Sequence, residues 1–155
     1  MLSSSDIKTI KKTAEEFFSK TTFESEIEVL PEEDQTVPIN LKIEEPQILI
    51  GEGGQTLNEI QHLLKAILRK KIASEEMFYI NLDINNYKKK KTEYLKETAR
   101  LAADDVSLSK KEKTLAPMPA YERRIIHLEL ANRSDVVSES IGEEPERMVI
   151  IKPHP

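Results

Sequence analysis

The chain has 155 residues, of which 38% are hydrophobic, with a net charge of −5 and no cysteine. That length can bury one full-sized core or two small ones, and the absence of cysteine excludes disulfides, thiolate zinc sites and cysteine nucleophiles. The sequence has no signal-peptide pattern and no apolar run of the roughly 18 residues that a membrane span requires. We therefore expect a cytoplasmic protein that does not insert into a membrane.

The charges are segregated along the chain. Acidic residues cluster in 24–26, 32–34 and 143–144, whereas basic residues cluster in 69–71 and 88–91. Binding of nucleic acid depends on local charge more than on total charge. The acidic total therefore does not exclude a basic binding surface.

The first third of the chain alternates between helical and strand periodicity. Apolar residues at helical spacing predict an amphipathic helix over about residues 6–19. Two alternating segments, 23–30 and 37–43, predict a β-hairpin, in which Pro38 favours an edge strand or the first residues of a strand. Residues 46–50 are expected to form one helical turn that begins with its proline.

A glycine-rich turn, Gly51-Glu52-Gly53-Gly54, holds three of the four glycines of the chain. The apolar stripe that follows predicts a helix over about residues 55–71, and the spacing of Thr56 and Glu59 predicts a capping box at its start. Residues 77–84 then have the alternation of a strand.

The second half begins with a long predicted helix, from about residue 87 to 107. Residues 115–119 are expected to be extended, because each proline there biases its predecessor away from the helical region. The residues expected to face the core from the long helix are Tyr94, Leu95, Leu101, Ala102 and Val106.

Helical periodicity returns over residues 120–132, and two alternating runs, 135–141 and 147–153, predict a C-terminal β-hairpin. Arg147 is expected to tie this hairpin together through Glu143 or Glu144. The apolar residues that define the helix are Tyr121, Ile125, Leu128 and Leu130.

The order of elements around the glycine turn, helix–strand–strand–helix–GxxG–helix–strand, resembles a type II KH domain. The second half resembles an R-three-H domain, since Arg123 and His127 are separated by three residues. Residues 115–128 and 139–147 are similar to the bacterial Jag family, also called SpoIIIJ-associated or KhpB proteins. The resemblance implies an α+β fold with a type II KH domain over residues 1–85 and an R-three-H domain over residues 86–155, without a counterpart of the N-terminal domain found in many Jag proteins.

This resemblance also implies a function. Membership of the family implies that this chain binds single-stranded RNA without catalysing a reaction and acts as a bacterial post-transcriptional regulator or RNA chaperone. It also implies a small KH-domain protein as a heterodimer partner. Family members usually carry one or two basic residues inside the GxxG loop, where this chain has Glu52 and Gly53. At roughly 6 Å in water, the Glu52 carboxylate repels a phosphate by about 0.7 kcal/mol, which predicts weakened binding.

The candidate nucleic-acid-binding residues fall in four groups. Glycines let a phosphodiester approach the main chain, and the start of the following helix offers unpaired N–H donors. The helix after the loop adds one polar side. The lysine run 88–91 fans around more than half of its helix, so only part of it can meet one ligand, whereas Arg123 and His127 share one helical face. The full set is Gly51, Glu52, Gly53, Gly54, Gln55, Asn58, His62, Lys65, Arg69, Lys88, Lys89, Arg123, Arg124 and His127.

Two other functions remain open from the residues alone. Glu52 and the net acidity favour a protein-interaction module with weakened RNA affinity, and the second domain is compatible with single-stranded DNA. The sequence contains no nucleophile motif, no cluster of metal ligands and no Walker-type lysine. We therefore expect neither catalysis nor a cofactor nor a bound metal.

Overall fold

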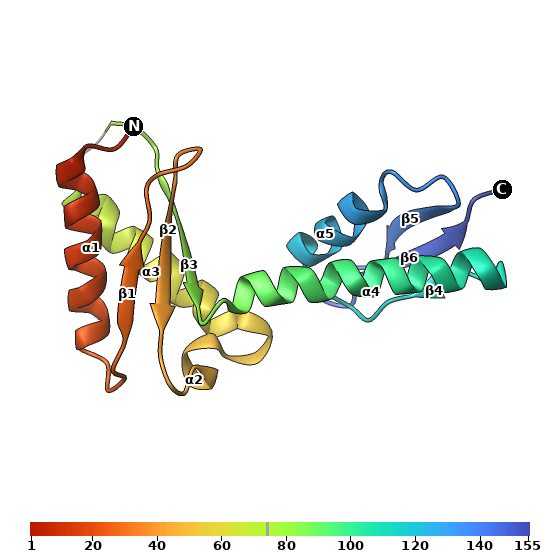
Figure 1. Ribbon diagram of the computed structural model, residues 1–155, viewed down its shortest axis with the longest axis horizontal. Helices are drawn as coiled ribbons and strands as arrows, with labels where there is room; N and C mark the ends of the chain where they lie inside the picture. The colour runs from red at the N-terminus through yellow and green to blue at the C-terminus, as the bar shows by residue number, and fades with distance from the viewer. Residues whose placement is uncertain (74) are drawn as a thin grey trace. The chain divides into compact units, whose positions relative to one another are not determined.

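The structure is a computed structural model that describes residues 1–73 and 75–155 (Figure 1). Its backbone divides into two compact units, Met1–Lys88 and Lys89–Pro155. Both units combine helices with a three-stranded sheet. The predicted α+β fold is therefore confirmed.

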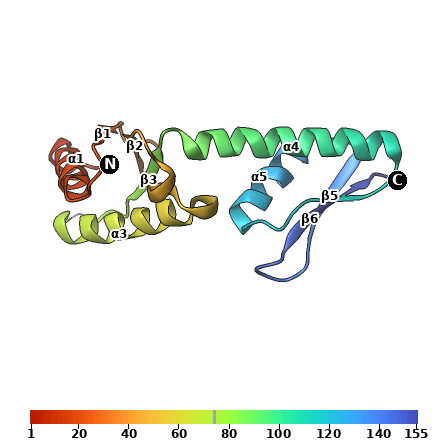
Figure 2. The ribbon, with the colours of Figure 1, turned by 90° about the horizontal axis from the view of Figure 1, so that it is seen from below.

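The first unit has the predicted order of elements. The sheet order is β1-β2-β3, with β1 and β2 antiparallel and β2 and β3 parallel, and helices α1 and α3 cover one face of this sheet (Figure 2). The elements are α1 (Ser4–Ser19), β1 (Glu26–Val29), β2 (Thr36–Lys42), α2 (Gln47–Ile50), the short 3-10 helix η1 (Glu52–Gly54), α3 (Gln55–Lys71) and β3 (Tyr79–Ile84).

The core of the first unit lies between the sheet and the two long helices. Alternate residues of β2 and β3 point toward the helices, and the helices turn toward the sheet the apolar residues that recur every three or four positions. The two sets of side chains pack into one core layer. Burying each of the larger apolar side chains contributes about 1.5–3 kcal/mol. The core includes Ile10, Ala14, Phe18, Val37, Ile39, Leu41, Leu57, Leu64, Leu68, Ile80, Leu82 and Ile84.

Pro38 lies in the central strand β2, as its third residue, so of the two expected positions the edge strand is wrong and the first residues of a strand are right. The N–H and C=O of one strand residue point to the same side, and the Pro38 carbonyl accepts a hydrogen bond from the Leu30 N–H on the β1 side. Leu30 is one residue beyond the end of β1. The N–H group that Pro38 lacks would therefore point to the β1 side, where the β1–β2 ladder has already ended. The pairing of β2 with β3 is unaffected.

The capping box predicted for Thr56 and Glu59 is also wrong. The N-cap of α3 is Gly54, which has no side chain to cap the helix, so Thr56 is the second helical residue. The Glu59 carboxylate instead accepts a hydrogen bond from the Gln55 side-chain amide at 3.2 Å. Helix α3 therefore begins two residues earlier than the capping pattern indicates.

The second unit contains the predicted C-terminal hairpin and one strand that the sequence did not reveal. The two-residue strand β4 pairs with β6 on the side opposite β5, which gives the order β4-β6-β5. The elements are α4 (Tyr87–Ser109, whose first two residues belong to the first unit), β4 (Lys113–Thr114), α5 (Ala120–Leu130), β5 (Val136–Ile141) and β6 (Met148–Pro153).

The predicted core-facing side of α4 is confirmed for Leu95, Ala102 and Val106 but not for its other two residues, and the apolar residues that define α5 do not all face the core. Tyr94 and Leu101 are 64% and 61% exposed, and in α5 Leu128 is 62% exposed. The alanines of α4 face the core and allow the helix to pack closely against it. Its larger apolar residues at 94 and 101 lie on a different side of the helix. The residues that do face the core are Leu95, Ala99, Ala102, Ala103 and Val106 from α4 and Ile126 and Leu130 from α5.

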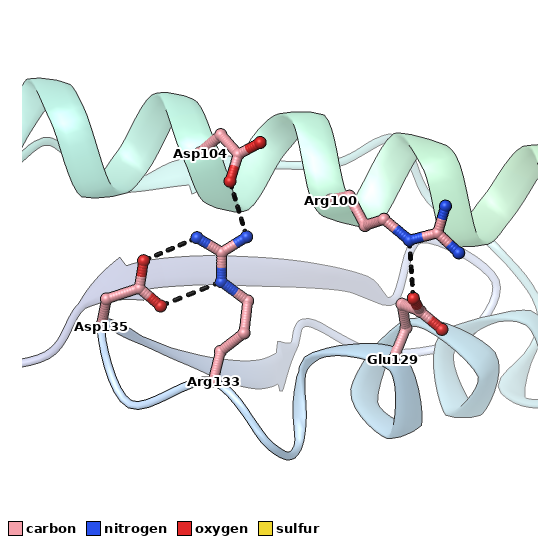
Figure 3. A network of polar contacts seen from close by, with 5 residues as sticks. All are labelled: Arg100, Asp104, Glu129, Arg133 and Asp135. Atoms are coloured by element: carbon pink, nitrogen blue, oxygen red, sulfur yellow. Dashed lines mark hydrogen bonds and ion pairs between the residues drawn. The ribbon is translucent and has the colours of Figure 1, made fainter.

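Two arginines link α4 to the α5 region by ion pairs (Figure 3). The Arg100 Nε lies 2.7 Å from a Glu129 carboxylate oxygen. Arg133, just after α5, donates to both oxygens of Asp135 at 2.9 and 2.6 Å and to Asp104 of α4 at 2.6 Å. The hydrogen bonds from Arg133, with a further one from Ser107, hold the pKa of the Asp135 carboxyl well below its usual range.

We predict that Asp135→Asn reduces the acid sensitivity of the fold. Because the pKa of Asp135 is depressed in the folded state, its carboxylate contributes stability above the unfolded pKa of about 4, and that contribution is lost as the pH falls below this value. The free energy of unfolding, measured in urea between pH 7 and pH 3, should therefore fall less steeply in the variant than in the parent. Glu146→Gln is the matched control, since Glu146 is exposed and makes no ion pair within the described residues; equal pH profiles for both variants would contradict the role of the Arg133 network.

Candidate nucleic-acid interface

The turn between α2 and α3 favours glycine at all three positions through its backbone angles, and at two of them there is also no room for a side chain. Gly51, Gly53 and Gly54 have φ angles of 73°, 60° and 83°, the left-handed region that side chains disfavour. A Cβ on Gly51 would lie 2.2 Å from the Thr56 hydroxyl, and one on Gly54 would lie 3.0 Å from the Tyr87 ring. Apart from its chain neighbours Glu52 and Gly54, nothing lies within 4 Å of a Cβ placed on Gly53, so no other part of the fold blocks a ligand there.

The turn leaves the first residues of α3 without a side-chain cap. The Gly54 N–H donates to the Gly51 carbonyl at 3.3 Å, and the Gln55 N–H donates to the Glu52 carbonyl. No side chain bonds the N–H groups at the start of α3, which carries the positive end of the helix dipole. Glu52 is exposed and makes no ion pair within the described residues. This combination of an open backbone and a helix start without a side-chain cap is suited to an anion, with Glu52 as an adjacent opposing charge.

The polar residues predicted along α3 do lie on one side of it. Residues 55, 58, 62, 65 and 69 fall within about 80° of each other at roughly 100° per residue, away from the buried Leu57, Leu64 and Leu68. Gln55, His62 and Arg69 are exposed, whereas Asn58 and Lys65 are half-buried. The structure thus joins the glycine turn to a continuous polar stripe.

Strand β3 contributes residues beside this stripe that the sequence interpretation missed. The Lys65 ammonium lies 4.3 Å from the centre of the Tyr79 ring, and the Tyr79 side chain remains 43% exposed. Gln61 of α3 accepts a hydrogen bond from the Leu82 N–H at 3.0 Å. Alternation in β3, which points Tyr79 and Asn81 outward, was the signal available in the sequence.

The lysine run does not act as one cluster. The Lys88 ammonium donates to Gln61 at 2.6 Å and to Asn81 at 3.0 Å, and burial lowers the pKa of Lys88 while the neighbouring Asp83 carboxylate opposes that shift. Lys91 lies 3.8 Å from the buried Glu122 carboxylate in the second unit. Lys89 and Lys90 are exposed. Only part of the run is therefore directed toward solvent.

A cavity of about 1090 Å³ in the first unit has the wrong charge for a phosphate. It is formed by residues 22–26, 42–45 and 85–86 and contains four glutamates and one lysine. Phosphate binding there would be opposed by like charge.

Arg123 of α5 is buried, with 7% of its surface exposed. Its guanidinium donates to the Met118 carbonyl at 2.7 Å and pairs with the Glu144 carboxylate at 2.7 Å. Through these two bonds it holds the segment before α5 and the β5–β6 turn against the helix. Arg124, in contrast, is exposed.

His127 lies one turn further along the same side of α5. Its two ring nitrogens are each 2.8 Å from a serine hydroxyl of β5, Ser138 at Nδ1 and Ser140 at Nε2. Burial lowers the pKa of His127, and the positive charge of Arg123 lowers it further. The two residues of the predicted Arg–His pair are thus brought together, but Arg123 is committed to protein contacts.

The β5–β6 turn is held by a contact different from the one predicted. Arg147 donates to the Gly142 carbonyl at 2.9 Å, and Glu144 binds Arg123 instead. In the sequence, Glu143 and Glu144 both lie close to Arg147. The spacing does not reveal that Arg123 of α5 competes for Glu144.

A model of the KH domain family matches residues 8–93 of the chain. The chain belongs to the KH family. A model of the R-three-H domain matches residues 93–153, so the second half of the chain has its predicted domain type. The KH match begins in α1 and includes the glycine turn, α3 and β3.

Proteins of known name resemble the chain over most of its length. A protein of Clostridium symbiosum named RNA-binding protein KhpB is 41% identical over 77% of this chain and 53% of its own length. Proteins of the same name from Bacillus subtilis and Lactiplantibacillus plantarum are each 34% identical, over 77% and 73% of this chain and 58% and 34% of their own lengths. The chain therefore spans between about a third and three fifths of these relatives.

The described residues were also searched for a metal site and for a membrane-spanning helix. Among them, no group of three or more histidine and carboxylate side chains is arranged to hold a metal ion. Within the same part of this KH protein, no helix combines the length and apolar character needed to cross a membrane.

We predict that Arg123→Ala destabilises the second unit by about 2 kcal/mol, because a buried hydrogen bond to a charged group contributes roughly 1.5–3 kcal/mol. Thermal unfolding compared with the parent measures this. The neighbouring exposed residue provides the control Arg124→Ala, for which a change within about 0.5 kcal/mol is expected. If both variants unfold at the same temperature as the parent, the two contacts of Arg123 do not support the fold.

Proposed function

We propose that this chain binds single-stranded RNA, and catalyses no reaction, through a surface that we call the loop–α3–β3 surface. It consists of Gly51–Gly54, the polar stripe of α3 and the outward residues Tyr79 and Asn81 of β3. The observation that carries the proposal is the glycine turn, whose open backbone at Gly53 leads into a helix start without a side-chain cap.

The turn suits capture of an RNA backbone. At Gly53 no residue other than its chain neighbours stands in the way of a phosphodiester that approaches the main chain, and the N–H groups and dipole of α3 favour its negative charge. KH domains clamp about four nucleotides by such a GxxG loop. The bases would then lie along the polar stripe of α3, where Tyr79 offers an exposed ring for stacking.

The second unit offers weaker support. Arg124 and Lys89 are exposed cations, and His127 lies beside two serine hydroxyls. Arg123 would act there by positioning α5 and the β5–β6 turn, since its guanidinium is bound to Glu144 and Met118. We therefore assign the main RNA contacts to the first unit.

The names of the relatives agree with this proposal, since those proteins are called RNA-binding. An RNA ligand also suggests a cytoplasmic location for this chain, because bacterial RNA is made and used there. The Jag family resemblance adds a small KH-domain protein as a proposed heterodimer partner. Co-purification of this chain with such a protein at an equal molar ratio would support that partner, and separate elution of the two would contradict it.

We predict that a fluorescent single-stranded RNA binds more tightly than about 100 μM at low salt, the weak end of typical non-specific affinity. A four-nucleotide clamp predicts a plot of log affinity against log salt with a slope of about −2 to −3, at roughly −0.7 per phosphate contact. The same sequence as DNA should bind more weakly, because it lacks the 2′-hydroxyl, and the duplex should bind most weakly. Tighter binding of DNA would assign the chain to single-stranded DNA, and no binding of any strand would favour the protein-interaction alternative.

We also predict that Glu52→Lys tightens RNA binding by about tenfold. Removing the repulsion of about 0.7 kcal/mol accounts for about threefold, and a new lysine contact of similar size accounts for the rest. Glu52→Gln should therefore give only the threefold part. Fluorescence anisotropy with the same RNA at fixed salt measures both changes.

The control for this series is Glu28→Lys, which alters the net charge equally. Glu28 is exposed on β1, the edge strand opposite β3, so its replacement should change the affinity much less than Glu52→Lys does. Equal tightening by the two lysine variants would mean that total charge, and not the glycine turn, governs binding.

A further inference from the structure

The free edge of strand β3 is covered at one point by a side chain of α3. Backbone N–H groups of β3 alternate in direction, and Tyr79, for example, donates toward the β2 side, to Gln35. The N–H of Leu82 faces the other way, where the Gln61 side-chain oxygen accepts it at 3.0 Å. Gln61 is thereby fixed against the strand edge.

The same Gln61 oxygen accepts a second hydrogen bond from the Lys88 ammonium at 2.6 Å. That ammonium also donates to the Asn81 side-chain oxygen at 3.0 Å. Lys88 is itself anchored, because its backbone N–H donates to the Asp83 carboxylate at 2.9 Å. One cation thus bridges the carbonyl oxygens of two amide side chains, one from α3 and one from β3.

This bridge determines which way both amides point. An amide side chain has one oxygen acceptor and one NH₂ group with two donors, and here both oxygens are directed toward Lys88. Neither NH₂ group donates a hydrogen bond within the described part of the chain. Asn81 is exposed and Gln61 half-buried, so the two amides present their NH₂ donors to a ligand while their oxygens face Lys88.

We propose that Lys88 is a positioning residue that gives the loop–α3–β3 surface a preference among bases. This inference rests on the proposed function, since it concerns the bases of an RNA bound there. A pair of donors matches a base edge with two adjacent acceptors: cytosine offers O2 and N3, and guanine offers O6 and N7. On the edges of adenine and uracil, each acceptor has a donor beside it. One of the two amide NH₂ groups would therefore face a donor of the base.

The structure therefore assigns Gln61 and Asn81 as base-contacting residues for cytosine or guanine, with Lys88 acting through them. Lys88 contributes no phosphate contact in this arrangement, because its ammonium is directed to the two amide oxygens. Its effect is on the choice of base, and that distinguishes it from the exposed Lys89.

The test compares single-stranded oligocytidine and oligoadenosine RNAs of equal length with the full chain at one salt concentration. The parent should bind oligocytidine about tenfold more tightly, since a bidentate contact discriminates by roughly 1–3 kcal/mol. Lys88→Met should bring the ratio of the two affinities close to one. The matched variant Lys89→Met should weaken both affinities alike and preserve the ratio, because it removes the same charge without touching the amides.

A second variant tests the donor argument without removing the lysine. Gln61→Glu keeps an oxygen for Lys88 and Leu82 but replaces the outward donors by an acceptor, so it should lower the cytidine-to-adenosine ratio by at least as much as Lys88→Met. Far-ultraviolet circular dichroism and a thermal melt establish that each variant is folded, and if Lys88→Met unfolds, Gln61→Glu decides the question. A ratio that stays near tenfold in a folded Gln61→Glu variant overturns the assignment.

The possible failures are distinguishable. If the parent binds both RNAs with equal affinity, the base preference is overturned and the proposed RNA-binding function stands. If the parent binds neither RNA, the proposed function itself fails. If Lys89→Met reduces the ratio as much as Lys88→Met, the role assigned to Lys88 is overturned.

Discussion

The left-handed backbone of the glycine turn is the constraint on which the rest of the first unit depends. Only the four residues 51–54 separate α2 from α3, and so short a connection is possible because Gly51 and Gly54 both have positive φ angles and no side chain. Larger residues would meet the Thr56 hydroxyl at the first position and the Tyr87 ring at the second. The contact with Tyr87 also connects the turn to the first residue of α4. The direction of α3, its packing on β3 and the exposure of its N-terminus all follow from this turn.

The charge on Glu52 has two opposite consequences at the same place. A carboxylate near the start of a helix is favourable, because it lies close to the positive end of the helix dipole. The same dipole is what an RNA phosphate would use. Glu52 therefore supports the helix while it competes with the proposed ligand, and a basic residue in its place would do the reverse. Weak affinity of the loop and stability of the turn are linked through one side chain.

Periodicity predicted the helices and strands of this chain well but not the contacts of its charged residues. The bounds of α3 and the β5–β6 hairpin follow from local apolar patterns. The orientation of α4 does not, since its alanines pack inward while Tyr94 and Leu101 stay exposed. Burial of Arg123 depends on Glu144, which lies 21 residues later and reaches α5 only through the fold of the hairpin. The Lys88 bridge likewise joins α3, β3 and α4, and no spacing along the sequence indicates such a three-way contact.

Cations that satisfy protein oxygens cannot be counted as phosphate contacts. Lys88 and Arg123 are both directed at carbonyl or carboxylate oxygens of the protein itself, and Lys65 lies over an aromatic ring. Arg69 is the member of the predicted α3 stripe that combines a permanent charge with exposure. Electrostatic attraction at this surface is therefore smaller than the number of lysines and arginines suggests. Binding would depend more on main-chain donors at the glycine turn and on amide contacts to bases, and such contacts discriminate among ligands where uniform positive charge does not.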